Sequence, residues 1–150
     1  MKLTVVGTGY VGLVTGTCLS DMGHHVICHD VDEKKITRLR DDKKIPIYEP
    51  GLEELVIRNA EAGRLEFTTD FDFATKDAEV VFIAVGTPPQ EDGSADLKHV
   101  LAVAENIGNH LRPSQHQTVV VKSTVPVGTC DKVRSLIDEV IEKRGVDASF

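Results

Sequence analysis

The chain alternates short apolar segments of strand type with segments whose apolar residues recur at helical spacing. The strand-type segments are residues 3–6, 25–30, 65–69, 79–85 and 118–121. The clearest helical stripe includes Val100, Ala104, Ile107 and Leu111. Because strands that alternate with helices usually pair in parallel through crossovers, we predict an α/β fold. It is a doubly wound, mostly parallel sheet with helices on both faces.

Three glycines mark the point where the first strand passes into the first helix. Gly7, Gly9 and Gly12 form the pattern G-x-G-x-x-G within GTGYVG. In a Rossmann-type fold the first glycine permits a tight turn, the second makes room for a pyrophosphate, and the third lets the helix pack closely. The free N–H groups at the helix start then face the phosphates. The pattern and its context favour a dinucleotide site.

Asp30 ends the second strand, 18 residues after Gly12. This is close to the roughly 20 residues expected for the acid that binds an adenosine ribose. Since its carboxylate would repel a 2′-phosphate, we expect NAD rather than NADP. Lys35, one turn into the second helix, reaches the same ribose or is simply solvated. The alternatives are a glycine-rich turn with Asp30 as a helix cap, or a site for a flavin or another adenine nucleotide.

Two threonines follow other strands, at the edge of the sheet where ligands bind in open α/β folds. Thr87 precedes two prolines in the polar loop 86–95, and Thr124 lies just past the strand 118–121. Thr87 is read as part of a cofactor wall, or of a loop that proline merely restrains. Thr124 has a hydroxyl free to donate.

The first helix is expected to turn the stripe Val11, Val14, Cys18 and Met22 toward the core, with Gly23 ending it. Cys18 and Cys28 are therefore both expected as core residues. Cys130 lies near a helix start and is read as unreactive. Three widely spaced cysteines favour free thiols in a reducing cytoplasm.

Charge and composition exclude several other classes of function. The formal net charge of −7 argues against nucleic acid and anionic membranes as partners. No apolar run approaches the roughly 18 residues of a membrane span. His24, His25 and His29 lack a matching set of cysteines or carboxylates, so we expect no metal site. His99, His110 and His116 are expected at the surface.

Four segments together resemble the NAD-binding domain of the UDP-glucose/GDP-mannose dehydrogenases. They are VVGTGYVGLVTGTCLSDMGHHVICHDVDEKKI, IPIYEPGLEELV, FIAVGTPPQEDGSADL and VVVKSTVPVGT, in this order along the whole chain. KSTVPVGT and the GTPP loop resemble the UDP-glucose branch more than the GDP-mannose branch. EPGLEEL and KSTVPVGT also argue against the 6-phosphogluconate and hydroxyacyl dehydrogenases.

The resemblance implies an enzyme that oxidises the C6 alcohol of a nucleotide sugar to a carboxylate with two NAD+ per sugar. It places Thr124 near the reacting carbon, where its hydroxyl orders a water. The residues that it assigns to NAD are Gly7, Gly9, Tyr10, Val11, Gly12, Asp30, Lys35, Thr87 and Thr124.

Members of this family are more than twice as long as this chain. Their nucleophilic cysteine lies in a later glycine-rich segment, and none of the three cysteines here has such surroundings. We therefore expect residues 1–150 to be a truncated NAD-binding domain without turnover of its own. The parent enzyme is expected to be a homodimer and this chain a monomer, and a free-standing NAD-sensing module is the alternative.

Overall fold

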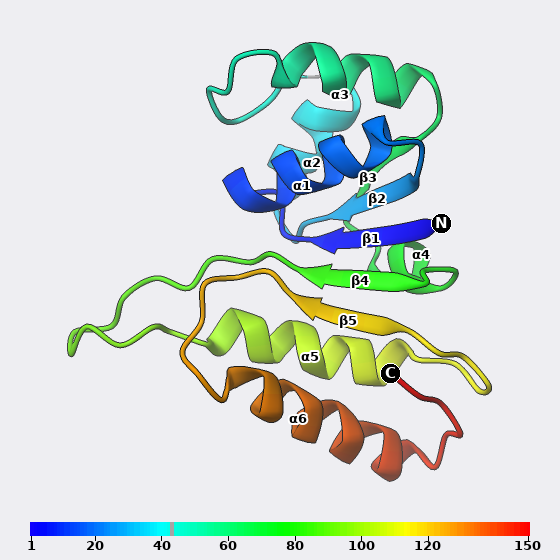
Figure 1. The fold of residues 1–150 in the computed structure, drawn as a ribbon, viewed down its shortest axis with the longest axis vertical. Coiled ribbons are helices and arrows are strands. Elements are labelled where there is room, and N and C mark those ends of the chain that lie inside the picture. Colours follow the sequence, from blue (N-terminus) through cyan, green and yellow to red (C-terminus); the bar gives the residue numbers. More distant parts are fainter. Residues whose placement is uncertain (43) are drawn as a thin grey trace.

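A five-stranded sheet runs through the computed structural model, which describes residues 1–42 and 44–150. The strands are β1 (Lys2–Val6), β2 (His25–His29), β3 (Leu65–Thr68), β4 (Val80–Ile83) and β5 (Thr118–Val121). Their order across the sheet is β3-β2-β1-β4-β5, and every neighbouring pair is parallel (Figure 1). The predicted doubly wound parallel sheet is confirmed, with strand ends one or two residues shorter than expected for β2, β3 and β4.

The described part of the chain contains six helices, of which α1 to α5 lie between successive strands and α6 follows β5. They are α1 (Tyr10–Asp21), α2 (Glu33–Arg40), α3 (Leu52–Glu61), α4 (Phe71–Thr75), α5 (Lys98–His110) and α6 (Thr129–Arg144). In Figure 1 α1 and α3 lie toward the β3 end of the sheet, and α5 and α6 lie toward the β5 end. Asp32 caps α2 by accepting hydrogen bonds from the N–H groups of Lys34 and Lys35, as its position predicts.

Two apolar cores form because successive side chains of a strand point to opposite faces of the sheet. Val5 of β1 faces α1 and belongs to a core built by β1–β3 with α1, α2 and α3. Val6, its neighbour, belongs to a second core with β4, α5 and α6. Helices therefore cover both faces, which is the arrangement that the alternation of elements predicts.

The predicted core stripe of α1 is wrong at three of its four positions, since only Val14 packs against the core. Val11 is 44% exposed and Met22 is 73% exposed, and Cys18 is exposed as well. The buried residues of α1 are instead Gly12, Leu13, Gly16, Thr17 and Ser20. Mostly small side chains face the sheet because the helix lies very close to it.

Gly16 shows how close this approach is. A Cβ built on Gly16 would lie 2.5 Å from the Sγ atom of Cys28 and 3.5 Å from side-chain atoms of Val26 and Val5. Cys28 is fully buried, as expected, and burial raises the pKa of its thiol to about 12. All three cysteines are free.

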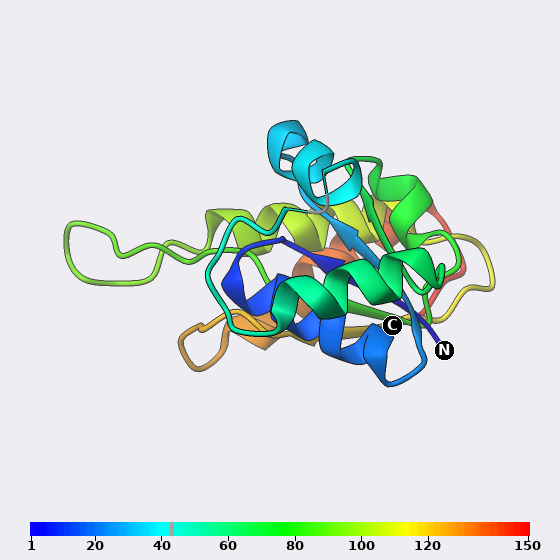
Figure 2. The same ribbon diagram turned by 90° about the horizontal axis from the view of Figure 1, so that it is seen from above.

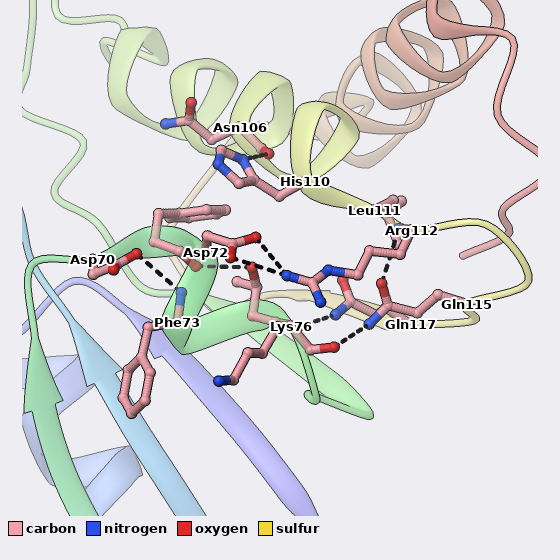
Figure 3. A network of polar contacts seen from close by, with 12 residues as sticks. Asp70, Asp72, Phe73, Lys76, Asn106, His110, Leu111, Arg112, Gln115 and Gln117 are labelled. Carbon is pink, nitrogen blue, oxygen red and sulfur yellow. Dashed lines mark hydrogen bonds and ion pairs between the residues drawn. The ribbon is translucent and has the colours of Figure 1, made fainter.

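The short helix α4 is held against the loop between α5 and β5 by polar contacts (Figure 3). Arg112 donates from Nη2 to both carboxylate oxygens of Asp72, each at 2.9 Å. Gln117 is buried and donates to the carbonyl oxygens of Thr75 and Ala78 at 2.7 and 3.1 Å. Gln117 thus satisfies one carbonyl group at the end of α4 and one just after it, and Arg112 pairs with a carboxylate of α4, so α4 has a defined position beside the sheet.

A long loop, residues 84–97, leaves the carboxyl end of β4 and extends away from the body, as Figure 2 shows from above. Its two arms are joined by backbone hydrogen bonds from Gln90 to Ser94 at 2.7 Å and from Asp96 to Pro88 at 2.9 Å. The loop predicted from polar composition is therefore a narrow hairpin-like projection at the ligand-binding edge of the sheet.

The close packing of α1 predicts a compensating pair of substitutions. We expect Gly16→Ala to lower the free energy of unfolding by about 1–3 kcal/mol, because the new methyl group overlaps the Cys28 sulfur. Cys28→Ala alone leaves a small void and is also destabilising. The double variant should be more stable than the sum of the two losses, since the methyl group added at position 16 occupies space that the sulfur vacates and alanine favours the helix. Urea unfolding of all four proteins measures the coupling, and simple additivity would contradict it.

Candidate functional site

The glycine turn between β1 and α1 is closed so tightly that two of its glycines have no room for a side chain. Gly7 has φ +105°, and a Cβ there would lie 2.6 Å from the carbonyl oxygen of Ala84. A Cβ on Gly12 would lie 1.8 Å from the carbonyl oxygen of Gly7. The Gly7 N–H also donates to the His29 carbonyl at 2.7 Å, which joins the turn to the end of β2. The absence of a side chain at Gly12 thus lets the first turn of α1 lie directly against the backbone of Gly7.

Gly9 differs from its two neighbours because the packing of the protein does not require it. Its φ of −73° suits any residue, and a Cβ at this position would meet no atom within 4 Å. Gly9 is the N-cap of α1, and no side chain of the described residues caps this helix. The open space therefore lies over N–H groups of the first turn that have no partner within the helix. This arrangement suits an anion, and α1 is long enough to present a favourable dipole.

Asp30 lies beside the turn, and its carboxylate is held from both sides. Thr8 donates to Oδ2 from its backbone N–H at 2.8 Å and from its hydroxyl at 2.7 Å. The N–H of Asp32 donates to Oδ1 at 3.0 Å. Burial alone would raise the pKa of Asp30, but the hydrogen bonds from Asp32 and Thr8, with the charge of Lys35, hold it below its ordinary value. Asp30 is therefore an oriented anion at neutral pH.

Lys35 lies next to this carboxylate, with its Nζ atom 3.7 Å from Oδ2 of Asp30. The alternative in which Asp30 caps the second helix is wrong, because Asp32 caps α2 and the carboxylate of Asp30 accepts from the backbone N–H groups of Thr8 and Asp32. Residue Thr8, which the sequence analysis did not select, is fully buried and holds the acid in place. The sequence feature that could have identified Thr8 is its position between Gly7 and Gly9, which the parallel sheet places opposite the end of the second strand.

A cavity of about 450 Å³ opens along the carboxyl ends of β1, β2 and β4. Gly7, Gly9, Asp30 and Lys35, all predicted, contribute to its wall. Residues of α4 and α5 that the sequence analysis did not assign to the site complete the wall, notably Phe71, His99 and Asn106. His99 and Asn106 share one face of α5, at a spacing of seven residues, which is the signal that could have found them.

The remaining predicted residues are not among those that form the cavity wall. The hydroxyl of Thr87 donates to the carbonyl oxygen of Thr124 at 2.9 Å, so the loops after β4 and β5 meet. Val11 is exposed, and the exposed Tyr10 hydroxyl donates to the carboxylate of Glu49. This bond links the first turn of α1 to the segment that precedes α3.

Two further observations limit the chemistry of the site. In residues 1–42 and 44–150, no group of three or more His, Cys, Asp or Glu is arranged to hold a metal ion. The histidine cluster that raised the metal question is split, since His29 is buried while His25 is exposed. No helix in the described ranges is both long and apolar enough to cross a membrane.

Comparison with known proteins decides the family. The model of the UDP-glucose/GDP-mannose dehydrogenase family, NAD binding domain, matches residues 1–150. The chain belongs to the UDP-glucose/GDP-mannose dehydrogenase family. The chain is therefore the NAD-binding domain of a family of oxidoreductases. The resemblance that the four sequence segments indicated is confirmed.

Individual members of the family cover nearly all of this domain. The UDP-glucose 6-dehydrogenase of Pseudomonas aeruginosa is 55% identical over 137 residues, which are 91% of this chain and 30% of that protein. UDP-glucose 6-dehydrogenase YwqF of Bacillus subtilis is 50% identical over 93% of this chain and 31% of its own length. The crystal structure of a ternary complex of GDP-mannose dehydrogenase from Pseudomonas aeruginosa has a TM-score of 0.89 and 44% identity, over 93% of this chain and 32% of that one. This dehydrogenase domain spans about a third of the length of these relatives.

The hydroxyl of Thr8 should contribute to stability only while Asp30 is charged. We expect Thr8→Val to raise the pKa of Asp30 and to lower the free energy of unfolding at pH 7 by about 1–3 kcal/mol. Because the pKa of Asp30 is depressed on folding, this stabilisation is present above the unfolded value of about 3.9 and is lost as pH falls through the folded value. Urea unfolding at pH 7 and pH 3.5 should show a smaller difference at the lower pH. Thr8→Ser, which keeps the hydroxyl, is the control, and a pH-independent loss would contradict the assignment.

Proposed function

We propose that this chain is the NAD-binding part of a UDP-glucose 6-dehydrogenase, the enzyme class that converts UDP-glucose and two NAD+ to UDP-glucuronate. One observation carries the cofactor assignment: Gly9 leaves open space over the first turn of α1, directly beside the oriented carboxylate of Asp30. The sugar assignment is supported by 55% identity to a UDP-glucose 6-dehydrogenase, against 45% to a GDP-mannose 6-dehydrogenase of the same organism.

The dinucleotide would lie across the turn with its pyrophosphate at the start of α1. Backbone N–H groups of Tyr10, Val11 and Gly12 supply donors there, and the missing side chain at Gly9 lets the phosphates approach. No lysine or arginine is required at this point, because the helix dipole and the free N–H groups favour an anion.

The adenosine ribose would be held by Asp30, with Lys35 beside it. Each carboxylate oxygen has about two acceptor positions. Thr8 fills both on Oδ2 and Asp32 fills one on Oδ1, so Oδ1 of Asp30 can still accept one ribose hydroxyl. A 2′-phosphate would bring a second anion against this buried charge, which favours NAD over NADP. Lys35 offsets only part of that charge, since its side chain is 41% exposed.

Thr87 and Thr124 would lie along the cofactor toward the nicotinamide. Their hydrogen bond uses the carbonyl oxygen of Thr124 and leaves its exposed hydroxyl free. That hydroxyl would orient a water near the reacting carbon, and we propose Thr124 as a catalytic residue on this basis. When bound, NAD+ supplies the hydride acceptor for oxidation of the C6 alcohol.

The nucleophilic cysteine of the reaction would come from outside these 150 residues. Cys28 cannot serve, because it is fully buried and its thiol has a pKa of about 12. The proposal therefore separates binding from turnover. The chain alone should bind NADH weakly, as a monomer, and should not reduce NAD+ in the presence of UDP-glucose. The full-length enzyme, proposed to be a homodimer in the cytoplasm, should perform both oxidations.

A GDP-mannose substrate is the second candidate, because the GDP-mannose dehydrogenase structure shares this fold with a TM-score of 0.89. The deciding assay follows NADH formation by the full-length protein that carries this domain, with UDP-glucose, GDP-mannose and UDP-N-acetylhexosamines as substrates. We expect two NADH per UDP-glucose and much slower turnover of the others. A preference for GDP-mannose or a UDP-N-acetylhexosamine would overturn the sugar assignment and leave the cofactor assignment standing.

Gly9→Ser provides a sharp test of the phosphate site. Serine suits both the backbone angle and the N-cap position of α1, so the free energy of unfolding should stay the same or rise by up to about 1 kcal/mol. The side chain occupies the space proposed for the pyrophosphate, so we expect NADH affinity to fall about tenfold or more. NADH fluorescence titration measures the affinity and urea unfolding the stability.

Gly12→Ala is the contrasting variant for this test. Its methyl group would collide with the turn, so its main effect should be a lower free energy of unfolding, which Gly9→Ser should not show. Unchanged NADH affinity in a folded Gly9→Ser protein would show that the phosphates lie elsewhere.

A further inference from the structure

His29 places an imidazole in the wall of the cofactor cavity, at the end of β2 and next to Asp30. The side chain is only 4% exposed. Its ring packs against the ring of Phe71 in a T-shaped arrangement, with a centroid distance of 5.1 Å and an interplanar angle of 86°. Phe71 in turn contacts His110 of α5 at 5.1 Å. The position of the imidazole is therefore set by packing from α4 and α5.

The partner of one ring nitrogen determines the role of the other. Nε2 of His29 lies 3.2 Å from the carbonyl oxygen of Thr69. Because a carbonyl oxygen only accepts hydrogen bonds, Nε2 must carry the proton in the neutral ring. Nδ1 is then an acceptor. It is buried and has no hydrogen-bond partner within the described residues. Burial also lowers the pKa of His29, which keeps the ring neutral at pH 7.

An unpartnered buried acceptor is unfavourable by about 1–3 kcal/mol, so one that belongs to a residue of the cavity wall needs an explanation. Its surroundings suggest the ligand group. Asp30 marks the ribose end of the cavity, and the wall beyond it contains Val31, Phe71 and Val103, which suit a flat apolar ring. A base joined to the ribose at Asp30 would enter this part of the cavity.

We propose that the 6-amino group of the adenine base donates a hydrogen bond to Nδ1 of His29, so that His29 selects adenine over 6-oxo purines. This inference rests on the proposed NAD site. The amino group is the only N–H donor on the adenine ring system of a dinucleotide, whereas ring atoms N1, N3 and N7 accept. An oxygen in its place would direct a second lone pair at Nδ1. His29 is a specificity residue in this arrangement and takes no part in hydride transfer.

The test compares NADH with its hypoxanthine analogue, deamino-NADH, which carries oxygen in place of the 6-amino group. Nicotinamide fluorescence gives the dissociation constant of each for this chain. We expect wild-type protein to bind NADH about 5–10-fold more tightly, the value of one neutral hydrogen bond. His29→Phe keeps an aromatic ring but removes the acceptor, and should bring the ratio near one. His29→Asn, whose amide oxygen can replace Nδ1 as the acceptor, should restore part of the preference.

His110→Phe is the matched control. It changes the other histidine that contacts Phe71, and His110 is not part of the cavity wall, so the ratio should stay at the wild-type value. A variant ratio is meaningful only for folded protein, which circular dichroism establishes. A second readout on wild-type protein needs no variant: the ¹⁵N resonance of His29 Nδ1 should shift on addition of NADH and much less with deamino-NADH.

The other possible results separate the role of His29 from the cofactor site itself. Equal binding of the two dinucleotides by wild-type protein would overturn the role of His29 and leave the NAD site intact. The role of His29 would also be overturned if His29→Phe kept the full preference for NADH over deamino-NADH, or if the Nδ1 resonance did not shift on addition of NADH. Failure of both dinucleotides to bind at millimolar concentration would refute the cofactor site and, with it, this inference.

Discussion

The close approach of Gly7 and Gly12 is the constraint on which the rest of the site depends. With 1.8 Å between the Gly7 carbonyl oxygen and the place of a Gly12 Cβ, α1 can begin only if residue 12 lacks a side chain. The same closure brings the Gly7 N–H to the His29 carbonyl and Thr8 to the carboxylate of Asp30. A single tight turn therefore sets the start of α1, the end of β2 and the orientation of the acid.

The periodic features of the sequence predicted the architecture well. Strand segments and helical stripes have distinct periods, so all five strands and the parallel sheet could be found without tertiary information. The burial of α1 could not. Its apolar residues Val11 and Met22 point outward, while Gly16 and Ser20 face the sheet. Apolar periodicity assumes that a helix buries its largest side chains, and this fails where the helix lies close enough to demand small ones.

Within the candidate site, the sequence identified the residues whose role follows from local backbone geometry. Gly7, Gly9 and Asp30 were found because a strand, a turn and a helix have fixed spacings. Thr8 and His29 were missed because their roles depend on partners far along the chain. Thr8 meets an acid 22 residues away, and His29 meets a carbonyl 40 residues away. Such pairs emerge only when β1, β2 and the segment before α4 are packed together.

The separation of the two apolar cores has a consequence for how the domain responds to its ligand. The cavity takes Asp30 and Lys35 from the half that contains α1 and α2, and Asn106 from the half that contains α5. A dinucleotide bound there would bridge two cores that also meet through the β1–β4 pairing and through the packing of His29 on β2 against Phe71 on α4. The bound ligand would contact both halves, so local opening of either half would first require its release. Amide protons deep in both halves would therefore exchange more slowly with the ligand bound than without it.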